Sequence, residues 1–408
     1  MSPRIAIIGA GPGGLTLARI LQRNDMPCTV FELDESRYSR EQGGIVDLHA
    51  NSGQRALKEA GLFEEFQKHS LPGAEAMKLV KFDGTVCWDE NDMNGLEVSQ
   101  SRDRPEIDRS QLRDILLDSL KPDSVHWGKK LLRVEANDAK YDLHFADGVD
   151  GGYDLVIGAD GAWSKVRPLV TDQMPEYSGV TAVELKAENV STKKQWLSSY
   201  VGSGSLFMMD EGRLIVAQQN GNDRIRVYAG VRQPEGWAKE CGIHWEEHDT
   251  ARKALADQYF GDCQQDLKRI ITEETSDGLI CRPLWMLPVG FKWDHRPGVT
   301  LLGDAAHLMT PFAGVGVNLA LADALDLATA LLKRKDAFGD HPQSTLSEAV
   351  KEYERPMFER AKENMEKTWQ GTKGHFSAGG IDQRVGRLRK RAKQIEEMKR
   401  ANSTQKVN

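Results

Sequence analysis

Three glycines near the N-terminus constrain the fold of this chain more than any other feature. Gly9, Gly11 and Gly14 stand in the spacing Gly-x-Gly-x-x-Gly, directly after the apolar run from Arg4 to Ile8. A second apolar run, CTVFE, ends at Glu32. A strand, a glycine turn, a helix and a second strand within about 30 residues form the βαβ unit that binds dinucleotides. The pattern therefore predicts a Rossmann-like α/β domain.

Each part of this motif has a physical reason. Gly9 permits a tight turn, Gly11 lets the backbone approach a pyrophosphate, and Gly14 lets the helix pack closely on the strand. The free N–H groups at the start of the helix attract phosphates. Glu32 is placed to accept hydrogen bonds from ribose hydroxyls. The motif predicts dinucleotide binding, but it does not distinguish FAD from NAD.

The overall composition excludes several classes of protein. A formal net charge of −7 argues against nucleic acid as the main partner. No apolar run approaches the roughly 18–20 residues of a membrane-spanning helix. The cysteines form no Cys-x-x-Cys pair, which argues against a disulfide framework: Cys28, Cys87, Cys241, Cys263 and Cys281. We therefore expect a cytoplasmic protein of about two or three domains, with no membrane partner.

Later segments indicate how the rest of the chain is organised. Residues 76–100 and 179–281 alternate in the manner of antiparallel strands, as in GRLIVAQQ and RIRVYAGV. YDLVIGADG and GVTLLGDA instead have the continuous apolar character of strands in a buried parallel sheet. Residues after Ser344 are helical in pattern, and Pro356 is expected to kink that helix or divide it in two. The prediction is an α/β fold with an inserted antiparallel sheet and a long C-terminal helix.

Two further motifs follow predicted strands. DLVIGADGAWSKVR places Asp160 and Gly161 after one buried strand, and LLGDAAHLMTPFAGVGVN places Asp304 after another. Taken alone, the first motif could be an ordinary turn and Asp304 an ordinary helix cap. Their order and spacing after the glycine turn favour a common role.

Together the three motifs resemble those of the single-component flavin-dependent aromatic hydroxylases, the para-hydroxybenzoate hydroxylase-like monooxygenases. The sequence is most similar to the tetracycline-inactivating monooxygenases, through GGIVDLHANSGQRALKEAGL, PEIDRSQLRDILLDSL and SKVRPLVTD. The resemblance covers about residues 4–370, is weak in the inserted sheet and is absent from the tail. It implies a Rossmann-like FAD-binding domain and a sheet domain that binds the substrate.

The resemblance also implies a set of cofactor-binding residues. Asp304 would bind the ribityl or pyrophosphate part of FAD, and the helix start from Gly314 to Asn318 would direct N–H groups at the pyrimidine edge of the flavin. Arg113 lies one helical turn after Arg109 and would reach the phosphates, although either arginine could instead occupy a solvated helix position. The complete set is Gly9, Gly11, Gly14, Glu32, Arg40, Asp47, Arg109, Arg113, Asp160, Asp304, Pro311, Gly314, Gly316, Val317 and Asn318.

Two positions bear on nucleotide specificity. Arg40 matches a position assigned to NADPH in the tetracycline-inactivating enzymes. Leu33 departs from the family pattern, because relatives often carry a basic residue directly after the ribose acid. The departure puts a cation contact to the adenine side in doubt.

The family's fold implies the following division of the chain. The FAD-binding domain would comprise residues 1–75, 102–178 and 282–335. Residues 76–101 and 179–281 would form the substrate-binding sheet domain. Residues 336–408 would form the C-terminal helix and a basic tail, which we interpret as a solvated helix.

The implied function is an FAD-dependent monooxygenase. Transiently bound NADPH would reduce FAD, and O2 would form a flavin C4a-hydroperoxide that transfers one oxygen atom to a bulky polycyclic, aromatic or enolic small molecule, a tetracycline or a secondary metabolite. Three alternatives stay open: a flavin-dependent halogenase, an oxygen-independent flavin reductase and a non-enzymatic binding protein. The halogenase signature Trp-x-Trp-x-Ile-Pro is missing, since PLWMLPVG does not match it. We expect a monomer, because no coiled-coil pattern is evident.

Other candidate residues have competing interpretations. Arg232 and Trp237 could line the substrate pocket or lie on the sheet surface. The segment HWEEH fits a zinc-protease pattern, but a polar helix face produces it by chance, and we expect no metal. His307 is interpreted as structural. The sequence indicates no catalytic base.

Overall fold

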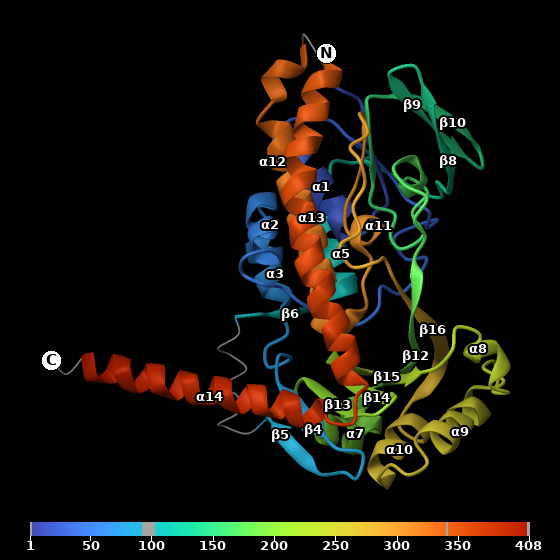
Figure 1. The fold of residues 1–408 in the computed structure, drawn as a ribbon, viewed down its shortest axis with the longest axis vertical. Coiled ribbons are helices and arrows are strands. Elements are labelled where there is room, and N and C mark those ends of the chain that lie inside the picture. Colours follow the sequence, from blue (N-terminus) through green and yellow to red (C-terminus); the bar gives the residue numbers. More distant parts are fainter. Residues whose placement is uncertain (1, 92–102, 340–341, 406–408) are drawn as a thin grey trace. The chain divides into compact units, whose positions relative to one another are not determined.

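The computed structural model describes residues 2–91, 103–339 and 342–405, which form two compact units (Figure 1). Unit 1 comprises Met1–Ser70, Ile107–Glu176 and Trp285–Trp369, and unit 2 comprises Leu71–Glu106, Tyr177–Leu284 and Gln370–Asn408. The parts of the expected segments at residues 1, 92–102, 340–341 and 406–408 lie outside the described residues.

Unit 1 is built on a five-stranded parallel sheet with the order β17-β11-β1-β2-β7. The strands are Val299–Leu301 (β17), Leu155–Gly158 (β11), Ile5–Ile8 (β1), Thr29–Phe31 (β2) and Val125–His126 (β7). The three central strands β17, β11 and β1 are apolar or glycine at nearly every position and are fully buried, as expected of parallel strands covered on both faces. The predicted Rossmann-like sheet is confirmed.

Helices pack against this sheet, and their order follows the chain. The main ones are Pro12–Arg23 (α1), Gly53–Ala60 (α2), Phe63–His69 (α3), Arg109–Asp118 (α5), Asp304–His307 (α11), Gly316–Leu332 (α12) and Pro342–His375 (α13). α1 and α12 pack closely because Gly13 has no side chain: a Cβ there would lie 2.7 Å from Leu302 Cδ1 and 3.1 Å from the backbone oxygen of Ala320. The two glycine-rich helix starts therefore belong to neighbouring helices.

Smaller elements complete unit 1. A three-stranded antiparallel sheet consists of Leu131–Asn137 (β8), Lys140–Phe145 (β9) and Gly148–Tyr153 (β10). Ile45–Asp47 (β3) pairs with Glu106–Asp108 (β6). Short 3-10 turns occur at Arg167–Leu169 (η1), Pro311–Ala313 (η2) and Lys335–Gly339 (η3).

Unit 2 contains a seven-stranded sheet with the order β16-β12-β15-β14-β13-β4-β5. Its strands are Met77–Val80 (β4), Val86–Asp89 (β5), Glu176–Glu188 (β12), Ser205–Asp210 (β13), Arg213–Asn220 (β14), Arg224–Arg232 (β15) and Ser276–Met286 (β16). The sheet is largely antiparallel as expected, but β4 and β13 pair in parallel. Alternation of side chains cannot predict this, because it is the same in both kinds of pair.

Five helices accompany the sheet of unit 2: Val190–Lys193 (α6), Gln195–Val201 (α7), Trp237–Glu240 (α8), His248–Tyr259 (α9) and Gln265–Thr272 (α10). Their apolar residues form one core with the inner face of the sheet. This core is separate in composition from that of unit 1.

The C-terminal region consists of two helices, α13 and Gly380–Gln405 (α14) (Figure 1). The expectation of a kink or break at Pro356 is not met by the secondary structure, since α13 is one helix that contains this residue. The chain turns at Gly380, where a Cβ would lie only 1.8 Å from the backbone oxygen of Gly374. The basic tail is therefore mostly an ordered helix in the part that the structure describes.

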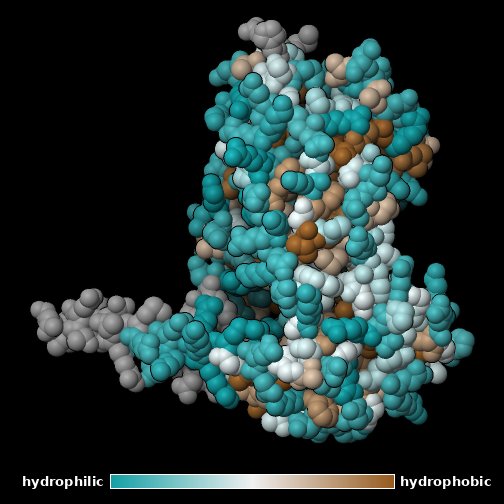
Figure 2. Space-filling view, in the orientation of Figure 1, coloured by the Kyte–Doolittle hydropathy of each residue, from teal (hydrophilic) through white to brown (hydrophobic). Residues whose placement is uncertain are grey.

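The surface is mixed in polarity. Figure 2 shows hydrophilic side chains over most of the face in view, with hydrophobic residues in separate small groups. Large exposed hydrophobic side chains occur in both units, for example Tyr38 and Ile280. Among the described residues, no helix combines the length and apolar character needed to cross a bilayer.

Candidate functional site

The glycine turn of unit 1 tolerates no side chain at two of its three motif positions. Gly9 has a φ of +111°, and a Cβ there would lie 2.3 Å from the carbonyl oxygen of Ala159 on the neighbouring β11 connection. A Cβ on Gly14 would lie 2.2 Å from the carbonyl oxygen of Gly9. These contacts between backbones bring α1 against β1 and explain why both positions need glycine.

Gly11 differs from both, because a Cβ on it would meet no protein atom within 4 Å. It is the N-cap of α1, has ordinary extended backbone angles, and receives no side-chain cap. The start of this helix therefore faces open space with unsatisfied N–H groups, the arrangement that binds phosphate. A pyrophosphate would fill the space that a side chain here would occupy.

Glu32 lies at the end of β2 and is almost completely buried. Its Oε2 accepts a hydrogen bond from the backbone N of Ala10 at 2.6 Å, and its Oε1 accepts one from the N of Asp34 at 3.0 Å. Each carboxylate oxygen has a second lone pair, so these bonds leave capacity for ribose hydroxyls. The carboxylate also fixes the glycine turn.

Arg113 and Arg40 meet at Asp34 beside this carboxylate. Arg113 is 2% exposed and donates to the backbone oxygen of Ala10 at 3.2 Å and to Asp34 Oδ2 at 3.2 Å. Arg40 is exposed, and its Nε lies 3.0 Å from each oxygen of Asp34. Arg113 thus supports the glycine turn from within the protein, and its contact to the phosphates stays a prediction. The cation missing at Leu33 is supplied from the next loop by Arg40.

Asp47, Gly314 and Asn318 lie together at the start of α12. The Nδ2 of Asn318 donates to the backbone oxygen of Asp47 at 2.8 Å, and its Oδ1 accepts from the N of His49 at 2.8 Å. Gly314 has a φ of +64°, and a Cβ there would lie 3.5 Å from Asp47 Oδ1. Asn318 therefore joins the β3 loop to α12 with its side chain, which leaves backbone groups for any cofactor contact.

The remaining predicted residues of this loop surround the helix start. Gly316 is the first residue of α12, and a Cβ on it would meet nothing within 4 Å. Pro311 begins η2 and is exposed, whereas Val317 packs partly against the core of unit 1. The start of α12 therefore resembles that of α1, with open space and free N–H groups.

Arg109 begins α5 and its guanidinium has no protein partner. Within residues 2–91, 103–339 and 342–405, no hydrogen bond or ion pair engages its side chain, and its positive charge acts on Asp304. An arginine with free N–H donors next to an open helix start is suited to a phosphate. Arg109 thus has the geometry that the sequence resemblance implies.

Asp160 and Asp304 stand at the ends of neighbouring strands β11 and β17. Oδ2 of Asp160 accepts from the backbone N of Lys165 at 2.7 Å, whereas its Oδ1 is buried without a protein partner among the described residues. Burial raises the pKa of the Asp160 carboxyl. An orphaned buried oxygen at the sheet edge is a further place where a bound group or water would be satisfied.

Asp304 is exposed and faces several cations. The protein packed around it raises the pKa of its carboxyl, while the charges of His307, Arg109 and Arg167 lower that pKa by less. Because the Asp304 side chain itself is open to solvent, we expect water to screen most of this upward shift. The carboxylate is available to a ligand.

Arg167 joins the two aspartate motifs, and the sequence did not identify it as a site residue. It is 2% exposed and donates from Nε to the backbone oxygen of Ala305 at 2.9 Å and from Nη2 to that of Asp304 at 3.1 Å. Its Nη1 donates to the backbone oxygen of Ala162 at 2.9 Å. Burial lowers the pKa of Arg167, which the charges of Asp160 and Asp304 partly offset. Its only sequence signal is its place at the end of the DLVIGADGAWSKVR motif.

The two residues predicted to contact substrate lie in unit 2 and are not together. Trp237 is 6% exposed and packs in the helical core, where its Nε1 donates to the hydroxyl of Tyr259 at 2.6 Å. The structure therefore gives Trp237 a core role and adds no support for a substrate contact. Arg232 is exposed at the end of β15, with its guanidinium over the ring of Phe376. Its substrate role stays a prediction.

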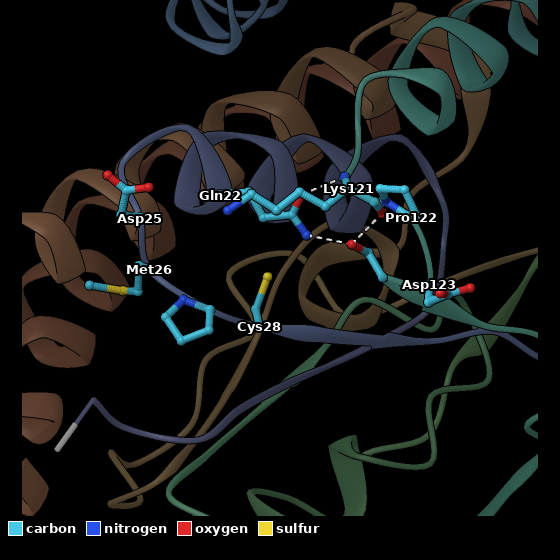
Figure 3. A pocket seen from close by; sticks show the side chains of 9 residues that line it. Gln22, Asp25, Met26, Cys28, Lys121, Pro122 and Asp123 are labelled. Atoms are coloured by element: carbon cyan, nitrogen blue, oxygen red, sulfur yellow. Dashed lines mark hydrogen bonds between the residues drawn. The ribbon is translucent and has the colours of Figure 1, made fainter.

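A pocket of about 360 Å³ lies elsewhere in unit 1, around Cys28 (Figure 3). It is at the C-terminal end of α1, whereas the glycine turn is at the other end of this 12-residue helix. Gln22 and Ser124 bond to each other there at 2.7 Å, and burial raises the pKa of the Cys28 thiol to about 12. This pocket is therefore neither part of the predicted cofactor site nor a reactive thiol site.

The sequence matches the family described as FAD binding domain over residues 3–352. This chain belongs to that family. It is 31% identical to the monooxygenase penA of Penicillium thymicola, with 93% of this chain and 97% of that protein covered. It is also 31% identical to the monooxygenase asqM of Emericella nidulans, over the same shares. The chain is an FAD-dependent monooxygenase, and this displaces the halogenase, reductase and non-enzymatic alternatives.

Solved structures show the same fold. The Klebsiella pneumoniae protein HpxO, in complex with FAD and uric acid, has a TM-score of 0.74 and 23% identity, with 96% of this chain and 93% of that chain covered. The tetracycline destructase Tet(51) has a TM-score of 0.68 and 20% identity, with 97% of each chain covered. At such identities the likeness shows the fold alone. The expected closeness to tetracycline-inactivating enzymes is therefore not supported, whereas the wider flavin monooxygenase family is confirmed.

FAD fits the residues of unit 1 on three observations: the open cradle at Gly11, the unengaged guanidinium of Arg109, and the orphaned oxygen of Asp160. When bound, FAD supplies the redox and oxygen chemistry. The chain's own residues bind and orient it: helix starts and Arg109 for phosphates, Glu32 for a ribose, and Asp304 for a polar group of the linker. NAD(P)H is the reductant typical of the family.

Proposed function

We propose that this monooxygenase uses NADPH and O2 to add one oxygen atom to an electron-rich carbon of a bulky aromatic or enolic small molecule, in secondary metabolism. In the balanced reaction, the substrate C–H becomes C–OH, one oxygen atom of O2 leaves as water, and NADPH supplies the hydride. The relatives support this substrate class. One is the 3-amino-4-hydroxybenzoate 2-monooxygenase of Streptomyces cremeus, at 29% identity, and another is an FAD-dependent urate hydroxylase of Klebsiella pneumoniae, at 26%. Each of these names an electron-rich ring.

The observation that carries the site assignment is the convergence of Gly11, Arg109 and Asp304 in one unit. Gly11 offers space, Arg109 offers unengaged donors, and its charge reaches Asp304. In unit 1 no protein group occupies these donors, so a dinucleotide is their natural partner. The substrate itself would be held apart from water, as reactive oxygen chemistry requires.

The test of the function measures coupling of NADPH to product. Purified protein with FAD is mixed with NADPH in isotopically labelled O2, with and without polycyclic phenols, enolic natural products and tetracyclines. We expect one class to increase NADPH consumption and to yield a product that contains one labelled oxygen atom, with little hydrogen peroxide. NADPH consumption that every compound leaves unchanged, or that yields only peroxide, would contradict the proposed substrate class. A response to tetracyclines alone would narrow it to them.

The role of Arg109 is tested by Arg109→Ala. A charge-assisted hydrogen bond to phosphate is worth about 1.5–3 kcal/mol, so we expect the dissociation constant of FAD to rise by roughly ten- to a hundredfold. The thermal midpoint of the apoprotein should stay the same, because no described residue bonds to this side chain. Arg113→Ala is the matched control on the same helix, and it should destabilise the apoprotein. Unchanged FAD affinity in Arg109→Ala would place the phosphates elsewhere.

A further inference from the structure

A fully buried carboxylate lies behind the loop that carries Asp304. Asp323, on α12, is 0% exposed and accepts three hydrogen bonds. They come from the backbone N of Gly303 at 3.0 Å, from Nε2 of His307 at 2.6 Å and from Nη2 of Arg360 at 2.8 Å. All of these residues belong to unit 1, and the bonds join α11, α12 and α13.

These contacts determine where Asp304 stands. Gly303 directly precedes Asp304 and has the left-handed φ of +60°, with a Cβ position only 3.2 Å from Ala320 Cβ on α12. His307 ends the short helix that begins at Asp304, and its backbone N donates to the oxygen of Gly303 at 2.9 Å. Asp323 thus contacts the residue before Asp304 and the end of the helix after it. Both contacts come from the same helix that begins at Gly316.

The charges around Asp323 form a balanced buried group. Arg360 bridges Asp323 and Asp326, the latter at 2.6 Å, and Tyr353 from α13 also faces Asp323. Burial raises the pKa of Asp323, but the charges and hydrogen bonds of His307 and Arg360 outweigh it and lower that pKa overall. Burial lowers the pKa of His307, but Asp323 and Asp304 outweigh it and raise that pKa overall. A carboxylate buried this deeply needs both cations.

We propose that Asp323 is a positioning residue for FAD: through Gly303 and His307 it holds Asp304 at a fixed distance from the N-terminus of α12. It touches neither FAD nor substrate in this role. The inference rests on the proposed FAD-binding roles of Asp304 and the α12 start. It adds that both roles depend on one buried carboxylate, because one helix carries the N-terminus and also holds the loop.

The alternative is that Asp323 only stabilises the packing of α12 against α13. The chain offers a matched control, because Asp326 lies on the same helix and pairs with the same arginine but does not contact the Asp304 loop in any described interaction. Asp326→Asn removes one bond to Arg360, and Asp323→Asn removes the other together with the loop contacts. Comparison of the two variants separates packing from positioning.

The experiment measures the dissociation constant of FAD from quenching of flavin fluorescence on the apoprotein, together with the apoprotein's thermal midpoint. We expect Asp323→Asn to raise the dissociation constant at least about tenfold in protein that is still folded, and Asp326→Asn to change it less than twofold. The flavin absorption band of Asp323→Asn should also lose its fine structure, since the ring would sit in a less ordered site. Equal effects of the two variants on FAD affinity would overturn the proposal.

A second variant covers the case in which Asp323→Asn does not fold. His307→Gln keeps a side-chain amide that can reach Asp323 but removes the imidazole charge. We expect it to weaken FAD binding at least about threefold, and an affinity equal to wild type would overturn the proposal. Failure of this proposal differs from failure of the FAD site itself. If Arg109→Ala and substitutions at Gly11 weaken binding while Asp323→Asn does not, then the site is correct and the positioning role is wrong.

The same pair predicts a pH dependence of stability. His307 has a folded-state pKa above its ordinary value of 6.5, so its contribution is fully present below about pH 6.5 and is lost as the pH rises through the raised value. The groups that face it are Asp323 and Asp304, with Arg360, Tyr353 and Arg167 behind them. We expect the apoprotein's thermal midpoint to fall between about pH 6.5 and 9 in wild type and to fall less in His307→Gln. Parallel pH profiles of the two proteins would contradict this ion pair.

Discussion

Gly14→Ala should lower the free energy of unfolding by about 3 kcal/mol, whereas Gly11→Val should leave it nearly unchanged and abolish tight FAD binding. The two glycines are three residues apart in one motif, yet their surroundings differ. A Cβ on Gly14 would lie 2.2 Å from the backbone oxygen of Gly9, and backbone cannot move aside as a flexible side chain can. Such a loss is a large part of the roughly 5–15 kcal/mol that stabilises a typical domain.

Gly11 has the opposite character. A Cβ there meets no atom within 4 Å, and the backbone angles are ordinary extended ones, so valine should be accepted by the apoprotein. Its methyl groups would fill the space proposed for the pyrophosphate. We expect the dissociation constant of FAD to rise by roughly a hundredfold or more, about 2.7 kcal/mol.

Denaturant unfolding of the apoproteins and fluorescence titration with FAD measure the two effects separately. Each variant is the control for the other, since one should lose stability and the other affinity. Full FAD affinity in Gly11→Val would show that the pyrophosphate does not lie at this helix start. A Gly14→Ala protein as stable as wild type would mean that α1 can move away from β1 without cost.

Arg167→Ala should destabilise the chain by about 3–5 kcal/mol, because a buried arginine would leave several backbone oxygens without donors. The side chain donates to Ala162, Ala305 and Asp304 and thereby joins the connections after two neighbouring strands. Alanine fills none of this space, and water would enter only at the cost of the packing around it. We also expect FAD to bind more weakly, since Asp304 would lose its support.

Arg37→Ala is the matched control, as the same chemical change at a more exposed site. Arg37 forms ion pairs with Asp114 and Asp118 at 2.7 Å, and pairs near solvent contribute about 0–1 kcal/mol. Denaturant unfolding of both apoproteins gives the comparison. A loss in Arg167→Ala no larger than in Arg37→Ala would contradict the bridging role of Arg167.

Local patterns determined much of this protein from the sequence alone. The βαβ unit follows from Gly9, Gly11 and Gly14 between two apolar runs, because glycine spacing and strand length are short-range features. Asp160 and Asp304 could be placed at one sheet edge because parallel strands share the direction of their carboxyl ends. The family resemblance then supplied the cofactor, which composition and periodicity could not.

Tertiary structure alone decided the contacts that join these motifs. Arg167 and Ala305 are 138 residues apart, and nothing in the local sequence of either predicts that one donates to the other. Trp237 looked equally suited to a pocket or a surface, and packing against Tyr259 put it in the core. Asp323 resembled any polar residue of a helix until its three donors were known. The physical reason is the same in each case: a buried polar group is determined by its partners, and the fold brings partners from distant segments.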